Sequence, residues 1–121
     1  MELHASGEDY LETILIIERE KGYVRSVDIA DRLGVTKPSV SRAVSLLRKG
    51  GFLCVNDNLL CLTETGRSVA EKIYERHCYF KQRLIDVGVD EETAEKEACQ
   101  LEHSLSDDSF NKIRNASDGG R

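Results

Sequence analysis

Proline, tryptophan and long apolar runs are scarce in this 121-residue chain, which has one proline, no tryptophan and 6% aromatic residues. Its longest aliphatic run, Ile14–Ile17, is far too short to cross a bilayer, so no membrane-spanning helix is expected. The chain begins Met1-Glu2-Leu3-His4, without the basic and then apolar stretch of a secretory signal peptide. It contains no repeat and no low-complexity tract. We therefore expect a cytoplasmic protein that does not act at a membrane.

No CxxC pair occurs among the four cysteines, Cys54, Cys61, Cys78 and Cys99, so a structural zinc knot is not expected. In a cytoplasm these thiols should stay reduced. Cys54 and Cys61 lie at equal distances from an Asp57-Asn58 turn, which would let them face each other across a hairpin. A small apolar pair is a better interpretation of this arrangement than a redox switch.

The overall composition, 40% apolar and 32% charged, fits one domain, or one small domain with an appendage. A net charge of −5 argues weakly against nucleic-acid binding, but the charge is unevenly distributed. Residues 19–50 contain eight basic and three acidic side chains, so this stretch is basic while the rest of the chain is strongly acidic. A local basic stripe is what contact with phosphates requires.

Apolar periodicity and capping residues predict helices over about 6–21, 27–33 and 37–49, the second capped by Ser26. Strands 52–55 and 59–62 should follow as a hairpin. Ala30, Gly34 and Val40 fit a helix-turn-helix, supplying a small contact residue, a turn glycine and an apolar plug.

Beyond the hairpin, the pattern predicts a long helix capped by Thr63, a fifth helix from Asp90 to about Leu105 and a short sixth helix. The predicted fold class is mainly α, with two parts. Residues 1–72 form an N-terminal winged helix-turn-helix with a two-stranded wing, and residues 73–121 form a helical metal-binding and dimerisation region.

The third predicted helix is the candidate recognition helix, because the first turns of such a helix enter the major groove of DNA. Arg42 could fork to a guanine edge, whereas Thr36 and Ser39 are better suited to phosphate. The predicted DNA-binding residues are Arg25, Thr36, Lys37, Pro38, Ser39, Ser41, Arg42 and Arg48. A helix that serves protein contact is the alternative. Asp57 at the wing tip would repel phosphate, so the wing should add little affinity.

Candidate metal ligands occur in three segments. Taken alone, the candidate ligands of each segment have an ordinary explanation. They could be a core histidine, surface charges, or acids that favour the positive end of a helix dipole. Together they combine carboxylate, imidazole and thiolate at helical spacing, which are the ligand types of a divalent transition metal. The predicted metal ligands are Asp9, Glu12, His77, Cys99, Glu102 and His103.

A resemblance to the diphtheria toxin repressor and manganese transport regulator family rests on five segments, namely Glu8–Ile14, Lys21–Arg25, Val27–Ala30, Lys37–Val40 and Leu101–Ser106. The similarity covers nearly the whole chain. It implies a dimeric, metal-dependent winged-helix repressor that binds a palindromic DNA operator when loaded with Mn(II) or Fe(II) and controls metal uptake genes. It further implies the short form of this family, without an SH3-like domain.

The resemblance also makes the metal site a hybrid. The manganese-responsive branch has the other five ligands but a glutamate in place of Cys99, whereas the iron-responsive branch has that cysteine but a methionine in place of Asp9. The ancillary site of the iron branch is altered, with Lys81 at a glutamate position and Glu95 at a histidine position. Oxygen ligands favour Mn(II), and the thiolate shifts the preference toward Fe(II), Co(II) or Zn(II). We predict Mn(II), with Fe(II) as the alternative.

Homodimer contacts are expected from the apolar surface of the later helices, because one small appendage cannot hide so many apolar side chains. The residues concerned are Leu84, Val87, Val89, Leu101, Leu105, Phe110 and Ile113. Two rival functions remain open. A metal-independent winged-helix regulator would sense an oxidant or a small molecule, and an enzyme would need an open coordination position, a cleft and a base. No motif for the latter is present, so no enzymatic activity is expected.

Overall fold

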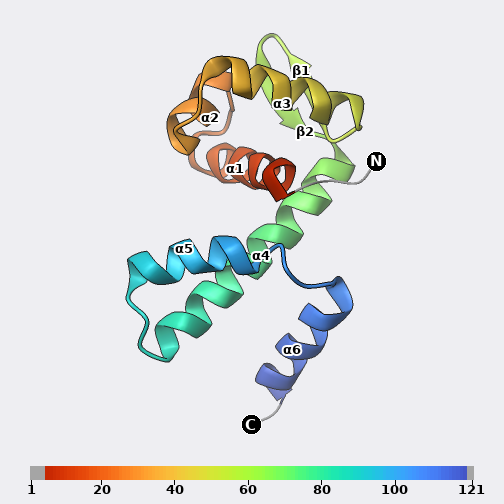
Figure 1. The fold of residues 1–121 in the computed structure, drawn as a ribbon. Helices are drawn as coiled ribbons and strands as arrows, with labels where there is room; N and C mark the ends of the chain where they lie inside the picture. The colour runs from red at the N-terminus through yellow and green to blue at the C-terminus, as the bar shows by residue number, and fades with distance from the viewer. Residues whose placement is uncertain (1–4, 120–121) are drawn as a thin grey trace. The chain divides into compact units, whose positions relative to one another are not determined.

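The computed structural model describes the backbone of residues 5–119 and the side chains of residues 6–116. Within that range the chain forms six helices and one two-stranded antiparallel sheet (Figure 1). It divides into two compact units, Met1–Lys72 and Ile73–Arg121, and helix α4 (Glu64–Asp86) begins in the first and ends in the second. None of the helices in the described range is long and apolar enough to span a membrane.

The first unit is a winged helix-turn-helix, as the sequence predicts (Figure 1). Its helices are α1 (Ala5–Lys21), α2 (Ser26–Leu33) and α3 (Lys37–Lys49), and its strands are β1 (Leu53–Asn56) and β2 (Leu59–Leu62). Helix α1 supplies the centre of the core, where Leu11, Ile14 and Leu15 are fully buried. Each such side chain contributes about 1.5–3 kcal/mol through removal of apolar surface from water.

The turn between α2 and α3 has the predicted chemistry. Gly34 ends α2 in the left-handed conformation at φ 68°, which a residue without a Cβ adopts at little cost. Thr36 then caps α3, its Oγ1 accepting a hydrogen bond from the Ser39 N–H at 3.3 Å. The prediction that Ser26 caps α2 is wrong. Arg25 occupies the cap position instead, because Asp28 accepts a hydrogen bond from its backbone N–H at 2.9 Å.

The wing is a tight hairpin in which Asp57 and Asn58 have φ values of 51° and 66°. Two successive left-handed residues make the turn that matches the twist of a hairpin, and Asp and Asn tolerate that conformation. The register pairs Cys54 with Cys61 directly, as the spacing predicts. The first strand begins at Leu53 and includes Asn56, one residue later at each end than predicted.

Gly66 lets the start of α4 approach the chain at the entrance to β1. A Cβ at this position would overlap the carbonyl oxygen of Phe52 and lie 2.9 Å from its carbonyl carbon. Both are backbone atoms, which cannot move aside as a flexible side chain could. The adjacent Thr63 anchors the same junction, since its hydroxyl donates to the Gly51 carbonyl at 2.7 Å and accepts from the Gly66 N–H at 3.0 Å.

The second unit consists of the rest of α4, α5 (Glu91–Leu101) and α6 (Asp107–Gly119). Asp90 caps α5 by accepting from the Thr93 N–H at 3.0 Å, as predicted. Phe110 of α6 packs edge-on against Tyr79 and Phe80 of α4, with ring centroids 5.4 and 5.8 Å away. Its exposure is only 3%, so Phe110 belongs to the core of this unit and the prediction of a dimer contact there is wrong.

Replacement of Gly66 by alanine should destabilise the fold by about 1–3 kcal/mol, because the new methyl group overlaps backbone rather than a movable side chain. Urea unfolding followed by circular dichroism would measure this loss. Ser68→Ala is the matched control, since Ser68 is exposed on the same helix and its loss should change stability by less than about 0.5 kcal/mol. Equal stabilities of the two variants would show that the close approach is dispensable.

Candidate metal centre and nucleic-acid interface

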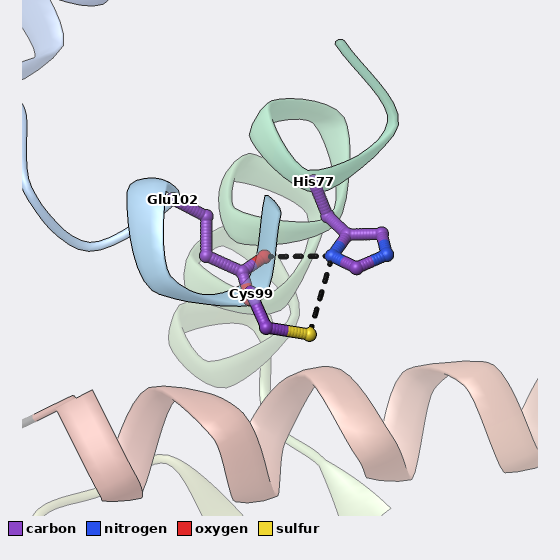
Figure 2. A group of neighbouring side chains, drawn as sticks. All are labelled: His77, Cys99 and Glu102. Carbon is purple, nitrogen blue, oxygen red and sulfur yellow. Dashed lines mark hydrogen bonds and ion pairs between the residues drawn. The ribbon is translucent and has the colours of Figure 1, made fainter. Parts of the chain in front are cut away.

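Three donor atoms of different chemistry converge where α5 ends beside α4. His77 of α4, Cys99 of α5 and Glu102, just after α5, each offer one ligand atom within 4.8 Å of the others (Figure 2). Nδ1 of His77 lies 3.7 Å from the Cys99 sulfur and 3.4 Å from Glu102 Oε2. Ligands around a tetrahedral ion with bonds of about 2.0–2.3 Å are separated by roughly 3.3–3.8 Å. The spacing of these atoms therefore suits a small divalent cation.

Glu102 is the most unusual residue of this cluster. Its side chain has no exposed surface, yet neither carboxylate oxygen has a hydrogen-bond donor among the described residues. A buried carboxylate without donors costs more than the 1–3 kcal/mol of an ordinary unsatisfied group, because its negative charge has also lost its water. A bound cation would supply the missing positive charge. The residues present thus fit a metal ion, on the evidence of this orphaned carboxylate.

The two oxygens of Glu102 face different imidazoles. Oε2 faces His77, and Oε1 lies 3.7 Å from Nε2 of His103, whose side chain is 12% exposed. At 3.4 and 3.7 Å, both nitrogens are farther from the carboxylate than in an ordinary hydrogen bond, and they lie at the spacing of shared metal ligands. Glu102 therefore stands between two nitrogen donors, and one carboxylate could serve both.

Electrostatics at His77 follow from its acidic neighbours. The Glu102 carboxylate raises the pKa of His77 to about 9, and the Glu95 carboxylate adds to this effect while burial opposes it. Without a cation, the imidazolium of His77 partly neutralises the acidic cluster. A metal ion bound at Nδ1 would take the place of the proton on that nitrogen.

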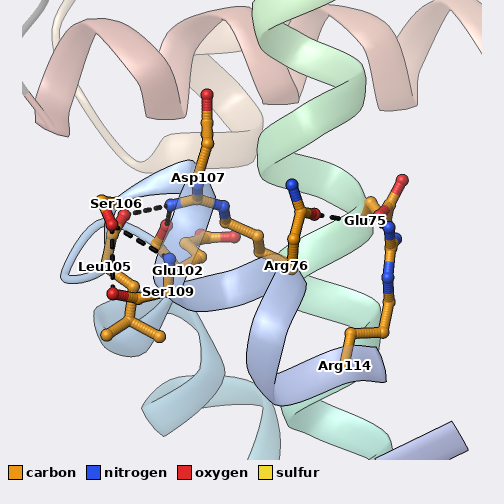
Figure 3. A network of polar contacts seen from close by, with 9 residues as sticks. Glu75, Arg76, Glu102, Leu105, Ser106, Asp107, Ser109 and Arg114 are labelled. Atoms are coloured by element: carbon orange, nitrogen blue, oxygen red, sulfur yellow. Dashed lines mark hydrogen bonds and ion pairs between the residues drawn. The ribbon is translucent and has the colours of Figure 1, made fainter. Parts of the chain in front are cut away.

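The turn after α5 is held by Arg76, the residue before His77 (Figure 3). Its buried guanidinium donates to the carbonyl oxygens of Glu102 at 3.3 Å and Leu105 at 2.6 Å, and also pairs with Asp107. These carbonyls would otherwise continue helical bonding. This explains why α5 ends at Leu101 and not at the predicted Leu105, and why Glu102 lies in a turn.

Arg76 was not among the predicted site residues. A signal was available, because Arg76 is three residues after Ile73 and four before Phe80, both of which belong to the apolar stripe of α4. An arginine on that face must be buried with partners for its donors, and backbone carbonyls are natural ones. A second charged pair, Glu75 with Arg114, joins α4 to α6 in the same region (Figure 3).

The remaining two predicted ligands lie on α1, in the first unit. Asp9 is half-buried and Glu12 is 7% exposed, one helical turn further along. The spacing of three residues places them on the same side of α1. Their role as ligands stays a prediction from the sequence.

The predicted DNA-binding residues are accessible. Ser39 is half-buried and the other seven, Arg25, Thr36, Lys37, Pro38, Ser41, Arg42 and Arg48, are exposed. The opposite face of α3 is anchored in the core by Val40, Val44 and Leu47. The helix therefore presents a polar and basic face, led by its N-terminal turn, on a rigid support.

A groove of about 780 Å³ separates α3 from the wing. Arg25, Ser41 and Arg48 line it, together with Lys49 and Asn58. Three cationic side chains around one concave surface produce a positive potential, which would favour a phosphate chain. Arg25 and Arg48 thus lie on a surface suited to phosphates, and their contact with DNA stays a prediction.

Comparison with known families matches almost the whole chain. Residues 2–58 match the family described as iron dependent repressor, N-terminal DNA binding domain. Residues 63–118 match the family described as iron dependent repressor, metal binding and dimerisation domain.

Individual relatives agree. The HTH-type transcriptional regulator MntR of Bacillus subtilis is 38% identical over 109 residues, covering 89% of this chain and 77% of the relative. An uncharacterised HTH-type transcriptional regulator of Methanocaldococcus jannaschii is 34% identical over 112 residues, covering 90% of both. Among solved structures, a manganese-dependent transcriptional repressor in complex with manganese has a TM-score of 0.81 at 27% identity, covering 93% of this chain and 52% of that one.

Replacement of Glu102 by glutamine should weaken metal binding by at least about tenfold, since it keeps the shape of the side chain but removes the buried charge. Titration with Mn(II) and Zn(II) by calorimetry would measure the affinity. Glu97→Gln, an exposed change on α5, is the control and should bind as the wild type does. An unchanged affinity in the Glu102 variant would count against this centre.

Proposed function

This chain belongs to the iron-dependent repressor family of metal-dependent transcriptional regulators, and we propose that it represses metal uptake genes by binding a palindromic DNA operator as a metal-loaded homodimer. Members of this family are regulators and not enzymes. The observation that carries the metal requirement is the buried carboxylate of Glu102, which has no hydrogen-bond donor in the described part of the chain and faces two imidazoles. We further propose that the protein acts in the cytoplasm, where the operator DNA would lie.

Six side chains would hold the metal under this proposal. They are Asp9, Glu12, His77, Cys99, Glu102 and His103. Three oxygen-bearing ligands suit Mn(II), and Fe(II) is the alternative because the thiol of Cys99 provides a softer donor. The bound ion would supply a fixed positive charge that joins α1 of the first unit to the helices of the second. Support for Asp9 and Glu12 comes from their spacing and from the family to which the chain belongs.

Recognition of DNA would rest on α3. Arg42, exposed in the second turn, has the fork of donors that reads O6 and N7 of guanine in the major groove. Thr36 and Ser39 at the start of the helix would bind phosphates, and Arg25 and Arg48 would clamp the backbone from the groove beside the wing.

Dimerisation would follow from apolar side chains that the second unit leaves exposed. Val87 is 76% exposed, Leu101 39% and Ile113 41%. An isolated unit gains nothing from showing these side chains to water, whereas a two-fold partner would cover them. A dimer would also present two copies of α3 to the two half-sites of a palindrome.

Control by the metal would come from the geometry of the dimer. Two recognition helices must lie about 34 Å apart to enter successive major grooves. If the metal-free protein adopts many separations, only the competent fraction binds, and the apparent affinity falls by that fraction. Ligands drawn from both units would restrict these separations once they share an ion. Linkage requires that operator DNA in turn tighten the metal site.

The decisive experiment measures DNA binding with and without metal. An operator would be selected from a random DNA library with the Mn(II)-loaded protein, and its affinity would then be compared with Mn(II), Fe(II), Zn(II) or EDTA. We expect at least about tenfold tighter binding with the cognate ion than with EDTA, a coupling of at least roughly 1.4 kcal/mol. If EDTA has no effect while peroxide changes the affinity, a thiol-sensing regulator is the better description.

Replacement of Arg42 by alanine tests the recognition helix. It should weaken specific operator binding by about 1–3 kcal/mol and relax the base preference at one position, without changing metal affinity in the free protein. Lys96→Ala removes an equal charge from an exposed site on α5 and serves as the control. Equal losses in both variants would mean that Arg42 contributes only general electrostatic attraction.

A further inference from the structure

The imidazole of His77 has two nitrogens, and they face chemically different surroundings. Nδ1 points toward the Cys99 sulfur and the Glu102 carboxylate, as Figure 2 shows. Nε2 lies on the other edge of the ring, 2.7 Å from Oε2 of Glu95. A separation of 2.7 Å is that of a charge-assisted hydrogen bond, shorter than the roughly 3.3 Å between two ligands of one tetrahedral ion. The ring thus has a metal-facing edge and a hydrogen-bonded edge.

We propose that Glu95 and Lys81 are positioning residues for the metal centre, forming a relay from Lys81 through Glu95 to His77 that presents Nδ1 to the metal. This inference rests on the proposed metal function and deepens it. A ligating histidine that donates its other N–H to a carboxylate has its ring orientation and tautomer determined by that bond. Glu95 is that carboxylate, and it is not itself a ligand.

Lys81 holds Glu95 in place. Its ammonium lies 3.0 Å from Oε1 of Glu95, on the oxygen that does not face His77, and 3.8 Å from Oε1 of Glu91. Oε1 of Glu95 therefore pairs with Lys81, whereas the imidazole is the nearest partner of Oε2. Glu95 is half-exposed, with a side-chain exposure of 48%, so without Lys81 it would be free to swing into solvent.

Either nitrogen of an imidazole can bind a metal ion, and the proposed relay would determine which nitrogen of His77 does so. Nε2 is the alternative ligand atom of the ring, and it lies farther from the backbone of α4 than Nδ1 does. The Cys99 sulfur also lies 3.8 Å from Glu95 Oε2, so an ion held by Nε2, Cys99 and Glu95 is the rival arrangement. The short bond between Nε2 and Glu95 leaves no space for an ion between these two atoms. The geometry therefore favours Nδ1 as the ligand.

The test uses the full-length protein labelled with ¹⁵N-histidine and loaded with Zn(II), a diamagnetic ion that suits imidazole and thiolate. Long-range ¹H–¹⁵N correlation spectra distinguish a metal-bound nitrogen from a protonated one. The wild type should show Nδ1 of His77 bound to Zn(II) and Nε2 protonated. The opposite assignment would overturn the relay while leaving metal binding itself intact.

Variants then separate positioning from general stability. Glu95→Ala should weaken Zn(II) binding by about 10–100-fold and give mixed His77 signals, whereas Glu95→Asp should recover most of the affinity. Lys81→Met should show a smaller loss, of roughly threefold, which Lys81→Arg reverses. Lys96→Met, an exposed lysine on α5, is the control and should have no effect. Thermal unfolding of each metal-free variant would check that the fold is retained.

Each outcome of this experiment either supports or overturns the proposed relay. Unchanged affinity and unchanged His77 signals in Glu95→Ala would overturn the proposed relay. If His77 of the wild type does not respond to Zn(II) at all, the relay also fails, because His77 is then no ligand. In that case, metal-stimulated operator binding, measured separately, shows whether the proposed function fails with it or survives with other ligands.

Discussion

The buried carboxylate of Glu102, for which the structure describes no hydrogen-bond donor, is the constraint around which the second unit is organised. Burial of the Glu102 carboxylate costs free energy in any protein interior unless neighbouring groups or a bound cation neutralise its charge. Two adjacent residues of α4 contact Glu102: Arg76 donates a hydrogen bond to its backbone carbonyl, and His77 faces its carboxylate. The fold therefore holds the position of this residue firmly, while among the described residues its carboxylate faces only the two imidazoles. Such a combination is better suited to a ligand than to stability.

Local rules were sufficient to predict the first unit. The helix-turn-helix follows from residues whose effects act within a few positions, such as Gly34 with its left-handed backbone and Thr36 as a cap. The hairpin follows in the same way from Asp57 and Asn58, which accept positive φ. These choices depend on neighbouring atoms only, so they could be read from the sequence with errors of about one residue. The cap of α2 was misplaced by one residue, because Asp28 accepts from the backbone N–H of Arg25 and so makes Arg25 the cap instead of Ser26.

Interactions between distant segments were harder to predict. The end of α5 depends on Arg76, a side chain 25 positions before Leu101 in the chain, and helical spacing within α5 does not reveal it. The pairing of Glu95 with both Lys81 and His77 is equally non-local. Helical spacing was enough to predict that imidazole, thiolate and carboxylate donors lie close together, and their role as ligands stays a prediction. Which nitrogen faces which partner required the three-dimensional arrangement.

The acidic tip of the wing affects how the protein would find its operator among the other sites of a genome. In the proposed dimer, Asp57 at the wing tip would repel phosphates, so each protomer would read DNA through one short helix and thus through only a few base pairs. Each correct base pair contributes about 1–3 kcal/mol of discrimination, whereas even a small genome offers on the order of 10⁶ competing positions. One half-site is then too little information to be found reliably. Mutations that lengthen or shorten the spacer between half-sites should therefore erase a regulatory site as surely as mutations in the bases that are read.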